Sequence, residues 1–195
     1  MLMSQDLPYL DLARRFAGFT EVAGVWSVPD PKARIRLDVI MGRDLYGRVL
    51  QFPVTVREDA SDLDPQVQLT ELDSTAIVSM ATGDPDAVRA VVSAIVNASS
   101  IESAECGLRV QGTGEAADAA SIGEVRLREV TRQRAVGAAR IGDTERNFVL
   151  RLAAQPGLVR PSSTAYQTPR LRLDGSSVEL FGEQPRVLAD LYWQS

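Results

Sequence analysis

The side chains that most often carry catalysis are nearly absent from this sequence. It has no histidine, one cysteine (Cys106) and one lysine (Lys32). Histidine is the side chain whose ordinary pKa lies in the neutral range. Without it the chain can build neither a Ser–His or Cys–His nucleophile pair nor a histidine-bearing metal site. We therefore predict no catalytic residue, no cofactor and no metal, and we keep an enzyme that uses carboxylates alone as a third alternative.

Neither the cysteine nor the densest acidic segment has the surroundings that its chemistry needs. Cys106 stands beside Glu105, and a neighbouring negative charge disfavours the reactive thiolate, so we expect a structural residue at the start of a strand. The acidic segment has neither the spacing of a calcium loop nor the glycine at which such a loop turns. We interpret it as a solvated loop that carries Glu58, Asp59, Asp62 and Asp64.

One glycine-rich segment matches a dinucleotide-binding pattern in its letters. Residues 112–117 (GTGEAA) read G-x-G-x-x-A and follow a predicted strand. The fingerprint also requires a full helix and a second, parallel strand, and such a crossover takes about a dozen residues or more. Only residues 115–121 lie before the next glycine, Gly123. We therefore interpret the segment as a flexible loop.

Arginines alternate along one predicted strand and its exit, and again along a later strand. Such a stripe can meet a phosphate or an acidic partner. The alternative is a solvated strand face with cross-strand pairs to Glu124, Glu129 or Glu179. The arginines are Arg126, Arg128, Arg132 and Arg134 in the first set, and Arg170 and Arg172 in the second.

Two tryptophans complete the candidate contact residues. Trp26 on the first predicted strand can stack on a sugar ring or belong to the core, as most tryptophans do. Trp193 lies in an apolar C-terminal tail, which we expect to dock on the body of the protein or on another subunit. The ligand or partner contacts that we name are Trp26, Arg126, Arg128 and Trp193.

Residues 1–100 show the periodicity of two helices and five strands. The helices are expected at 5–16 and at 85–97, where Asp84 and Pro85 are typical of an N-cap and a first helical position. Pro53 indicates an edge position or a bulge in its strand. Alternation predicts strands at 19–28, 34–41, 49–57, 67–72 and 75–81, of which 34–41 and 49–57 pair as a hairpin.

Residues 101–195 read as a second, β-rich half. An Asp174–Gly175 turn is expected to lead into a hairpin strand at 178–181. The tail, residues 185–195, is expected to form a short helix. The other predicted strands are 107–111, 124–130, 147–153 and 169–174. Runs of strands with segregated helices are typical of the α+β class. We predict curved antiparallel sheets with a covering helix, and the two halves can merge into one sheet.

The composition excludes several partners and locations. The chain has 195 residues, 45% of them hydrophobic and 24% charged, which is typical of a folded protein. Its net charge of −5 disfavours nucleic acid and anionic lipid as partners. The N-terminus lacks a secretory pattern, no stretch approaches the roughly 20 apolar residues of a membrane span, and one cysteine forms no intrachain disulfide. We expect a cytoplasmic protein.

Residues 7–96 resemble the N-terminal cap domain of actinobacterial maltokinases and stand-alone proteins with a cap-like domain. LPYLDLARRFAGF is similar to the family's opening helix, VLQFPVTVRE to one of its strands, and STAIVSMATGDPDAVRAVVSAI to its final strand, D-P turn and covering helix. The resemblance implies a cystatin-like curved sheet wrapped on a helix. The catalytic lobe is missing, and nothing matches the loop or the metal-binding aspartate that phosphoryl transfer needs, so no catalytic residue carries over.

These observations favour a non-catalytic, cytoplasmic interaction or regulatory module. Its partner would be another protein or a second copy, and the resemblance links it to α-glucan or trehalose metabolism. The alternative is a small-ligand binding protein with a pocket between the curved sheet and a helix. Self-association would also protect edge strands, for which we name 49–57.

Overall fold

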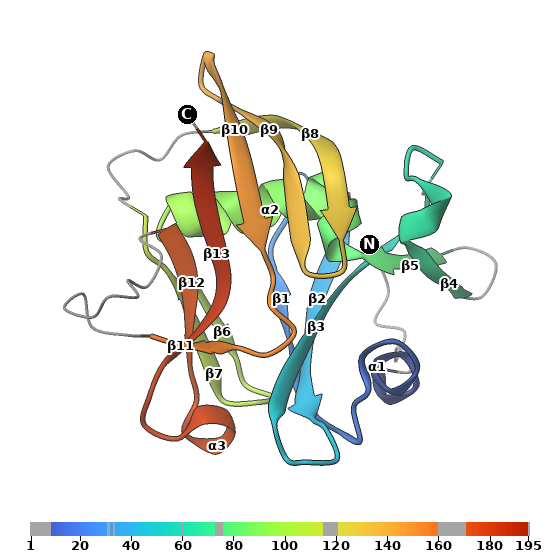
Figure 1. The fold of residues 1–195 in the computed structure, drawn as a ribbon, viewed down its shortest axis with the longest axis vertical. Helices are drawn as coiled ribbons and strands as arrows, with labels where there is room; N and C mark the ends of the chain where they lie inside the picture. The colour runs from blue at the N-terminus through green and yellow to red at the C-terminus, as the bar shows by residue number, and fades with distance from the viewer. Residues whose placement is uncertain are drawn as a thin grey trace.

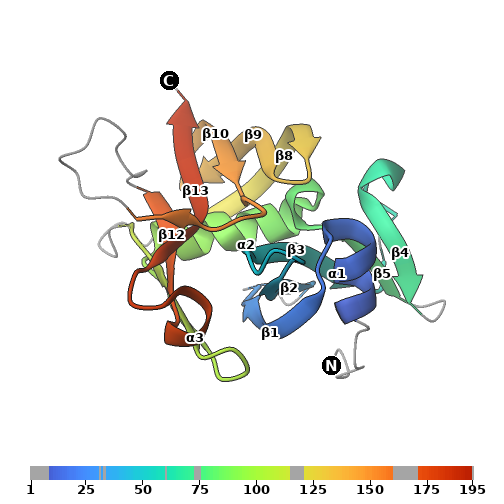
Figure 2. The same cartoon turned by 60° about the horizontal axis from the view of Figure 1, so that its bottom comes forward.

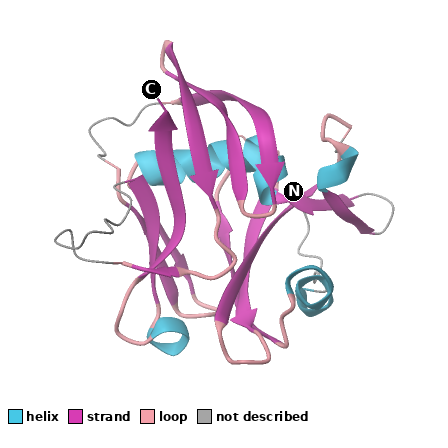
Figure 3. Cartoon of the chain, viewed as in Figure 1, coloured by secondary structure: helices cyan, strands magenta, loops and turns pink. Residues whose placement is uncertain are grey.

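Two antiparallel sheets lie on opposite sides of one helix in the computed structural model (Figures 1 and 2). The structure describes residues 9–30, 32, 34–59, 61–72, 76–114, 121–159 and 171–194. Strands predominate over helices in these ranges (Figure 3). The prediction of an α+β protein with antiparallel sheets is confirmed. The division of the chain at residue 100 stays a prediction.

Both sheets are antiparallel throughout their described pairings. Sheet A has the order β1 (Glu21–Val28), β2 (Arg36–Arg43), β3 (Val49–Arg57), β5 (Ala76–Met80), β4 (Gln68–Leu72). Sheet B has the order β6 (Ser100–Ser103), β7 (Leu108–Gly112), β12 (Leu171–Ser176), β13 (Arg186–Gln194), β10 (Thr144–Arg151), β9 (Arg134–Ile141), β8 (Ile122–Thr131), and β11 (Gly157–Leu158) pairs with β13.

The described helices are short. They are α1 (Tyr9–Ala17), α2 (Pro85–Val96) and α3 (Val178–Phe181), with 3₁₀ turns η1 (Pro65–Val67) and η2 (Ala81–Gly83). None of the helices in the described ranges has both the length and the apolar character needed to cross a bilayer.

Helix α2 is buried on nearly all sides because it separates the two sheets (Figure 2). It begins as the sequence predicts. The Asp84 side chain accepts hydrogen bonds from the backbone N–H groups of Asp86 (2.9 Å) and Ala87 (3.4 Å), and Pro85 takes the first helical position. Nine of its twelve residues are buried, including Arg89 on the weakly polar side. A helix without a polar face is stable inside a core.

Sheet A is covered on both faces. Strand β2 contributes Leu37, Val39 and Met41 to the core around α2, and its opposite face contributes Ile40 to the cluster under α1. We expected one buried and one exposed face for the strand at 34–41, but both faces of β2 are buried.

The polar residue on this second face is satisfied internally. Asp38 is only 1% exposed. Its carboxylate accepts hydrogen bonds from the Tyr9 hydroxyl (2.9 Å), the Ser27 hydroxyl (2.7 Å) and Arg36 Nε (2.8 Å). These bonds offset the cost of burying a charge, so helix α1 is joined to β1 and β2 through one side chain.

Strand β3 lies in the middle of sheet A, so the expectation that 49–57 is an edge strand is wrong. Pairing with β5 begins only at Val54, however, so Pro53 has a strand neighbour on the β2 side alone. A missing N–H is tolerated at such a position. Beside it, the backbone N–H of Gln51 donates to the carbonyl of Ala154 at 2.8 Å, which joins this free margin to the second half of the chain.

The outer margin of β1 is closed by the turn between β6 and β7. The Val25 N–H donates to Glu105 Oε2 (3.2 Å), and the Val25 carbonyl accepts from the Ser103 hydroxyl (2.7 Å). Cys106 is 1% exposed and packs closely on β1. A Cβ added at Gly24 would lie only 2.8 Å from the Cβ of Cys106. Cys106 is thus a packing residue, as the sequence predicts.

The C-terminal tail is a strand, so the predicted helix over 185–195 is wrong. Strand β13 pairs with β12 on one side and β10 on the other. Its residues alternate between the core (Ala189, Leu191, Trp193) and the outer face (Asp190, Tyr192), which is the period of a strand. The alternation was present in the sequence, and the short length of the tail concealed it.

The predicted hairpin strand at 178–181 is also wrong. Gly175 continues β12, where it pairs with both β7 and β13, and residues 178–181 form helix α3. The Ser177 hydroxyl accepts a hydrogen bond from the Leu180 N–H at 3.3 Å, which is a helix N-cap. Strands β6, β9 and β11 were not predicted. Strand β9 (RAVGAARI) is rich in alanine and glycine, which are depleted in strands.

One hydrophobic core contains residues from both halves of the chain. It combines Trp26 and Val39 of sheet A with Val91 and Ile95 of α2, and it continues into Phe148 and other residues of sheet B. Ile95 and Phe148 are both fully buried. The two sheets therefore share the helix that each of them covers.

This shared core predicts that the two halves unfold together. Trp26 lies in sheet A and Trp193 in sheet B, so each tryptophan reports on one half. In each of the single variants Trp26→Phe and Trp193→Phe, unfolding by urea is followed by the fluorescence of the remaining tryptophan and by far-UV circular dichroism. The two probes should give the same midpoint of unfolding. Adding Ile95→Ala should lower the free energy of unfolding by about 2–5 kcal/mol and move both midpoints together. Two different midpoints within one variant would show independent halves.

Candidate functional site

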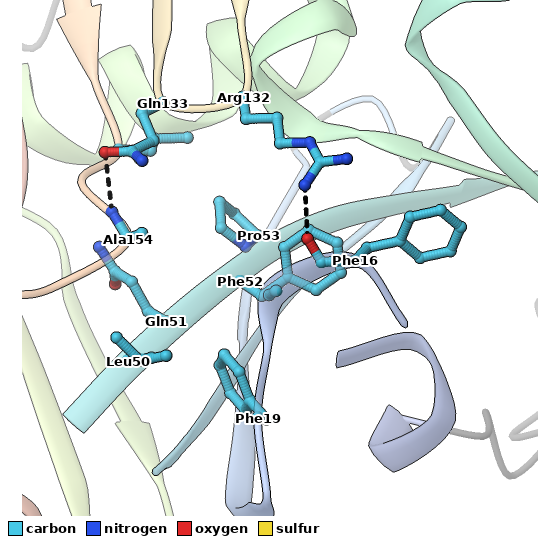
Figure 4. A pocket seen from close by; sticks show the side chains of 11 residues that line it. Phe16, Phe19, Leu50, Gln51, Phe52, Pro53, Arg132, Gln133 and Ala154 are labelled. Atoms are coloured by element: carbon cyan, nitrogen blue, oxygen red, sulfur yellow. Dashed lines mark hydrogen bonds between the residues drawn. The ribbon is translucent and has the colours of Figure 1, made fainter. Parts of the chain in front are cut away.

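A cleft of about 220 Å³ opens beside the free margin of β3 (Figure 4). Four segments that are distant in sequence meet there: the end of α1, strand β3, the turn between β8 and β9, and the chain after β10. The lining residues are Phe16, Ala17, Phe19, Leu50, Gln51, Phe52, Pro53, Arg132, Gln133, Leu152 and Ala154.

Three phenylalanines give the cleft an apolar wall. Phe16 comes from the last turn of α1 and is half-buried, whereas Phe19 and Phe52 are 2% and 7% exposed. Gly18 adopts φ +74°, the left-handed conformation that commonly ends a helix. Phe19 then lies across β2 at Gly42, where a Cβ would stand 2.6 Å from its ring. Glycine at this position is what allows the ring to pack.

Two polar side chains of the β8–β9 turn form the opposite rim (Figure 4). Arg132 Nη1 donates to the carbonyl of Phe16 at 2.5 Å. Gln133 Oε1 accepts from the Ala154 N–H at 3.2 Å, and the Gln133 carbonyl accepts from the Leu152 N–H at 2.9 Å. The turn is therefore fastened at one end to α1 and at the other to the chain after β10.

Gln51 holds the inner end of the cleft in place. Gln51 is only 2% exposed, and its Nε2 donates hydrogen bonds to the carbonyls of Ala153 (2.8 Å) and Leu188 (2.6 Å). Together with its backbone bond to Ala154, these contacts link β3 to the second half of the chain. A buried amide with fulfilled hydrogen bonds fixes the geometry of its surroundings.

The cleft is locally positive although the whole chain has a net charge of −5. Among the described residues that line it, Arg132 alone is charged, and none is acidic. Within the described part of the chain, Arg132 has no ion-pair partner, and its one hydrogen bond is to the Phe16 carbonyl. Its guanidinium has five N–H donors in all, so most of them are uncommitted.

A second group of charged side chains is buried at the start of α2. Arg57 Nη2 lies 2.8 Å from Asp86 Oδ2, and Arg89 Nη1 pairs with the other oxygen of Asp86. Arg89 Nη2 also lies 3.0 Å from Asp30 Oδ1, and Arg57 Nη1 lies 3.0 Å from Asp62 in the acidic loop. Arg89 thus bridges two carboxylates and Arg57 three, because Arg57 Nε also lies 3.6 Å from Asp84 Oδ2. Buried charges paired in this way are tolerated.

Two aspartates of this group have pKa values shifted in opposite directions. Burial raises the pKa of Asp84, whose Oδ2 has no hydrogen-bond partner among the described residues. Burial opposes ionisation of Asp30 too, but two backbone N–H groups and the Arg89 guanidinium outweigh it and lower the pKa of Asp30. A carboxylate enzyme needs two acids with divergent pKa values in one cleft. Neither of these side chains lines the cleft, so we interpret the group as structural.

Trp26 belongs to the core, which is the second of the two interpretations that the sequence allowed. It is 3% exposed, and its buried Nε1 has no hydrogen-bond partner in the described ranges. It lines a cavity of about 10 Å³ at the junction of sheet A, α2 and sheet B, together with Gln51, Val91 and Leu188. That volume holds about one water molecule, so this cavity has no room for an organic ligand.

The arginines of the predicted stripe separate in space. Arg126 is 62% exposed and pairs with Glu145 across β9, and Arg128 is exposed on the same edge strand. A cross-strand ion pair therefore exists, with a different partner from the three glutamates expected. Arg132 leaves the stripe and turns into the cleft. A role of Arg126 and Arg128 in partner contact stays a prediction.

Trp193 docks on the body of the chain. It is half-buried on β13 and packs against the core, with the Arg146 guanidinium 5.8 Å from its ring centre. Its role in contacting a ligand or partner stays a prediction. In the second arginine set, Arg172 pairs with Asp174 at 2.8 Å, and Arg170 lies outside the described residues.

The glycine-rich segment serves packing. A Cβ at Gly112 would collide with the carbonyl of Ala94, and one at Gly114 with the carbonyl of Val96. Both glycines therefore allow the chain to pass close to the C-terminal end of α2, where a phosphate would meet carbonyl oxygens. The remainder of the pattern, 115–117, lies outside the described residues. In the described ranges, no three acidic or thiol side chains come together as a metal site would require.

Sequence reasoning found one residue of the cleft and missed the others. Arg132 was named as part of the arginine stripe, and the phenylalanines were recognised only as members of helices or strands. The cleft depends on contacts between segments more than 100 residues apart, such as Arg132 with Phe16. The one local signal was the pair Phe16 and Phe19 on either side of the helix-ending Gly18.

No protein-family model matches the chain, and no curated protein matches it either. The resemblance to the maltokinase cap domain therefore depends on the three sequence segments quoted above.

The lowered pKa of Asp30 predicts a defined pH dependence of stability. A lowered native pKa means that ionised Asp30 favours the folded state above about pH 4, the ordinary range of an unfolded aspartate, and that this contribution is lost as the pH falls through the native value. Asp30→Asn should therefore be less stable than the unmodified chain at pH 7, and the difference should narrow below about pH 4.

Urea unfolding at a series of pH values measures this difference. Glu102→Gln is the matched control, because Glu102 is 69% exposed in its pair with Arg109 and should contribute little at any pH. A difference for Asp30→Asn that stays constant from pH 7 to pH 3 would contradict the prediction.

Proposed function

We propose that this chain is a non-catalytic binding protein whose cleft takes one small, largely apolar ligand. The observation that carries the proposal is the cleft itself, which Phe16, Phe19 and Phe52 line and whose rim is formed by Arg132 and Gln133. Ligand sites in proteins are mostly apolar with a few polar groups that set orientation. The cleft has this composition, and its walls are fastened by hydrogen bonds at both ends of the rim.

The volume limits the size of the ligand. A cavity of ~150 Å³ is large enough to bind benzene. By the same ratio, the cleft of about 220 Å³ takes a molecule of roughly nine non-hydrogen atoms. One aromatic ring with a short substituent has this size. A nucleotide or a disaccharide is too large to enter completely.

A second candidate is the interaction module that the sequence favours. Leu45, Tyr46 and Val178 are 70%, 74% and 81% exposed. Arg43 donates hydrogen bonds of 3.1 Å to backbone carbonyls of both segments, so the β2–β3 turn and α3 form one apolar end of the molecule. A protein partner or a second copy that covers this end would bury three large apolar side chains.

The finer parts of this second candidate rest on the resemblance to maltokinase caps. They are the cystatin-like description of sheet A, the link to α-glucan or trehalose metabolism, and the cytoplasmic location, to which the single buried Cys106 adds support. Net charge of −5 again favours partners other than nucleic acid.

The binding function predicts that small neutral ring compounds enter the cleft. Indole has about nine non-hydrogen atoms, and at roughly 0.3 kcal/mol per atom it should bind with Kd of about 10 mM or tighter. Titration followed by NMR should shift resonances of Ala17, Leu50 and Gln133. Ala17→Phe fills the cleft and should abolish these shifts, whereas Ala17→Ser keeps it open and should retain them. Shifts that persist in Ala17→Phe would place the binding elsewhere.

The interaction module predicts a partner that depends on the apolar end. Affinity capture from the native host should retain an enzyme of α-glucan or trehalose metabolism with the unmodified chain, and lose it with Leu45→Ser/Tyr46→Ser. The control Arg140→Gln/Asp143→Asn, at two exposed positions near the β9–β10 turn of sheet B, should capture it normally. Capture of no such enzyme by the unmodified chain would remove the metabolic link.

A further inference from the structure

We infer that the ligand of this cleft is a compact monocarboxylate, with an aromatic or branched apolar body held among the phenylalanines and its charged end at Arg132. This inference rests on the proposed binding function and assigns the chemical class of the ligand. It follows from the charge, the free donors and the size of the site.

The first argument is the unbalanced charge of the rim. The buried Arg57 and Arg89 each meet carboxylates, whereas Arg132 is exposed at the mouth of the cleft and meets none among the described residues. Arg132 reaches over an apolar cleft, and no acidic side chain lines that cleft. A guanidinium beside an apolar wall attracts a carboxylate more strongly than one in open solvent, because the effective dielectric constant is lower there.

The second argument concerns free hydrogen-bond donors. Nη1 of Arg132 is committed to the Phe16 carbonyl, which leaves the other N–H groups of the fork for a ligand. Across the rim, Gln133 uses its oxygen to accept from Ala154, and its Nε2 has no hydrogen-bond partner within the described residues. The rim thus presents donors on both sides (Figure 4). A carboxylate is a pure acceptor and matches them.

The third argument limits the charge of the ligand to one. Among the lining residues Arg132 contributes one positive charge, and the C-terminal end of α1 at Phe16 and Ala17 contributes a partial negative charge of up to about one half. The Arg15 guanidinium lies outside the lining, 5.0 Å from the centre of the Phe16 ring. A dianion such as a phosphate monoester would leave excess negative charge beside this helix end. Phosphate sites instead use helix N-termini or several cations.

The size and the walls complete the assignment. Roughly nine non-hydrogen atoms fill the cleft, of which the carboxylate takes three. The remaining atoms correspond to one phenyl ring or a branched alkyl group, which can pack against Phe19 and Phe52. Benzoate has this composition. Benzamide has the same shape without the charge.

The test compares benzoate with benzamide on the unmodified chain, on Arg132→Gln and on Arg128→Gln. Arg128 is a matched control, because it is an exposed arginine on the strand that leads to Arg132 and does not line the cleft. Chemical shifts of Ala17, Leu50 and Gln133 report cleft occupancy at pH 7. The unmodified chain and Arg128→Gln should bind benzoate about ten-fold more tightly than benzamide, and Arg132→Gln should bind the two equally.

The outcomes separate this inference from the proposed function. If both compounds shift the cleft resonances with the same Kd in the unmodified chain, or if Arg132→Gln keeps the preference for benzoate, the carboxylate assignment is wrong and the binding function stands. If neither compound, nor indole, shifts these resonances at 20 mM or so, about twice the Kd expected for a ligand of this size, the binding function itself is wrong. The comparison of the two compounds on the unmodified chain needs no variant to fold.

Discussion

Burial of helix α2 between two sheets is the constraint from which the rest of the structure follows. A helix enclosed on nearly all sides cannot leave the charges of its first turn in water. Asp84, Asp86 and Arg89 must find partners inside, and they do so in Arg57 of β3 and Asp30 after β1. The ion pairs therefore join β3 and the loop after β1 to the start of the helix, beside the apolar contacts that pack sheet A on α2.

The cleft is a consequence of how sheet A meets the second half of the chain. Pairing of β3 with β5 stops at Val54, and the free stretch before it is occupied by Gln51 and its bonds to the chain after β10. Side chains complete the contact that strand pairing does not provide, and they fill the space less evenly. Between Gln51 at one end and the Arg132–Phe16 bond at the other, an apolar opening remains.

Local patterns in the sequence predicted individual helices and strands where those patterns are strong. They did not predict how these elements are arranged in space. The Asp84–Pro85 start of α2 and the alternation of β3 were visible because capping and pleating act over a few residues. Strand β9 was missed since pairing with two neighbours overrides its low intrinsic preference. The cleft could not be predicted, because it depends on Arg132 meeting a carbonyl 116 residues away. The same limit applied to Asp38, a buried acid in a strand that reads as half-exposed.

The closed margin of β1 affects how the chain behaves at high concentration. An unpaired strand margin is a template on which identical chains can stack into fibrils. Here the exposed amide and carbonyl of Val25 are occupied by the side chains of Glu105 and Ser103. A second chain can therefore pair with the β1 margin at Val25 only after the β6–β7 hairpin has moved away, whereas β4, the opposite edge of sheet A, has no such cover among these contacts.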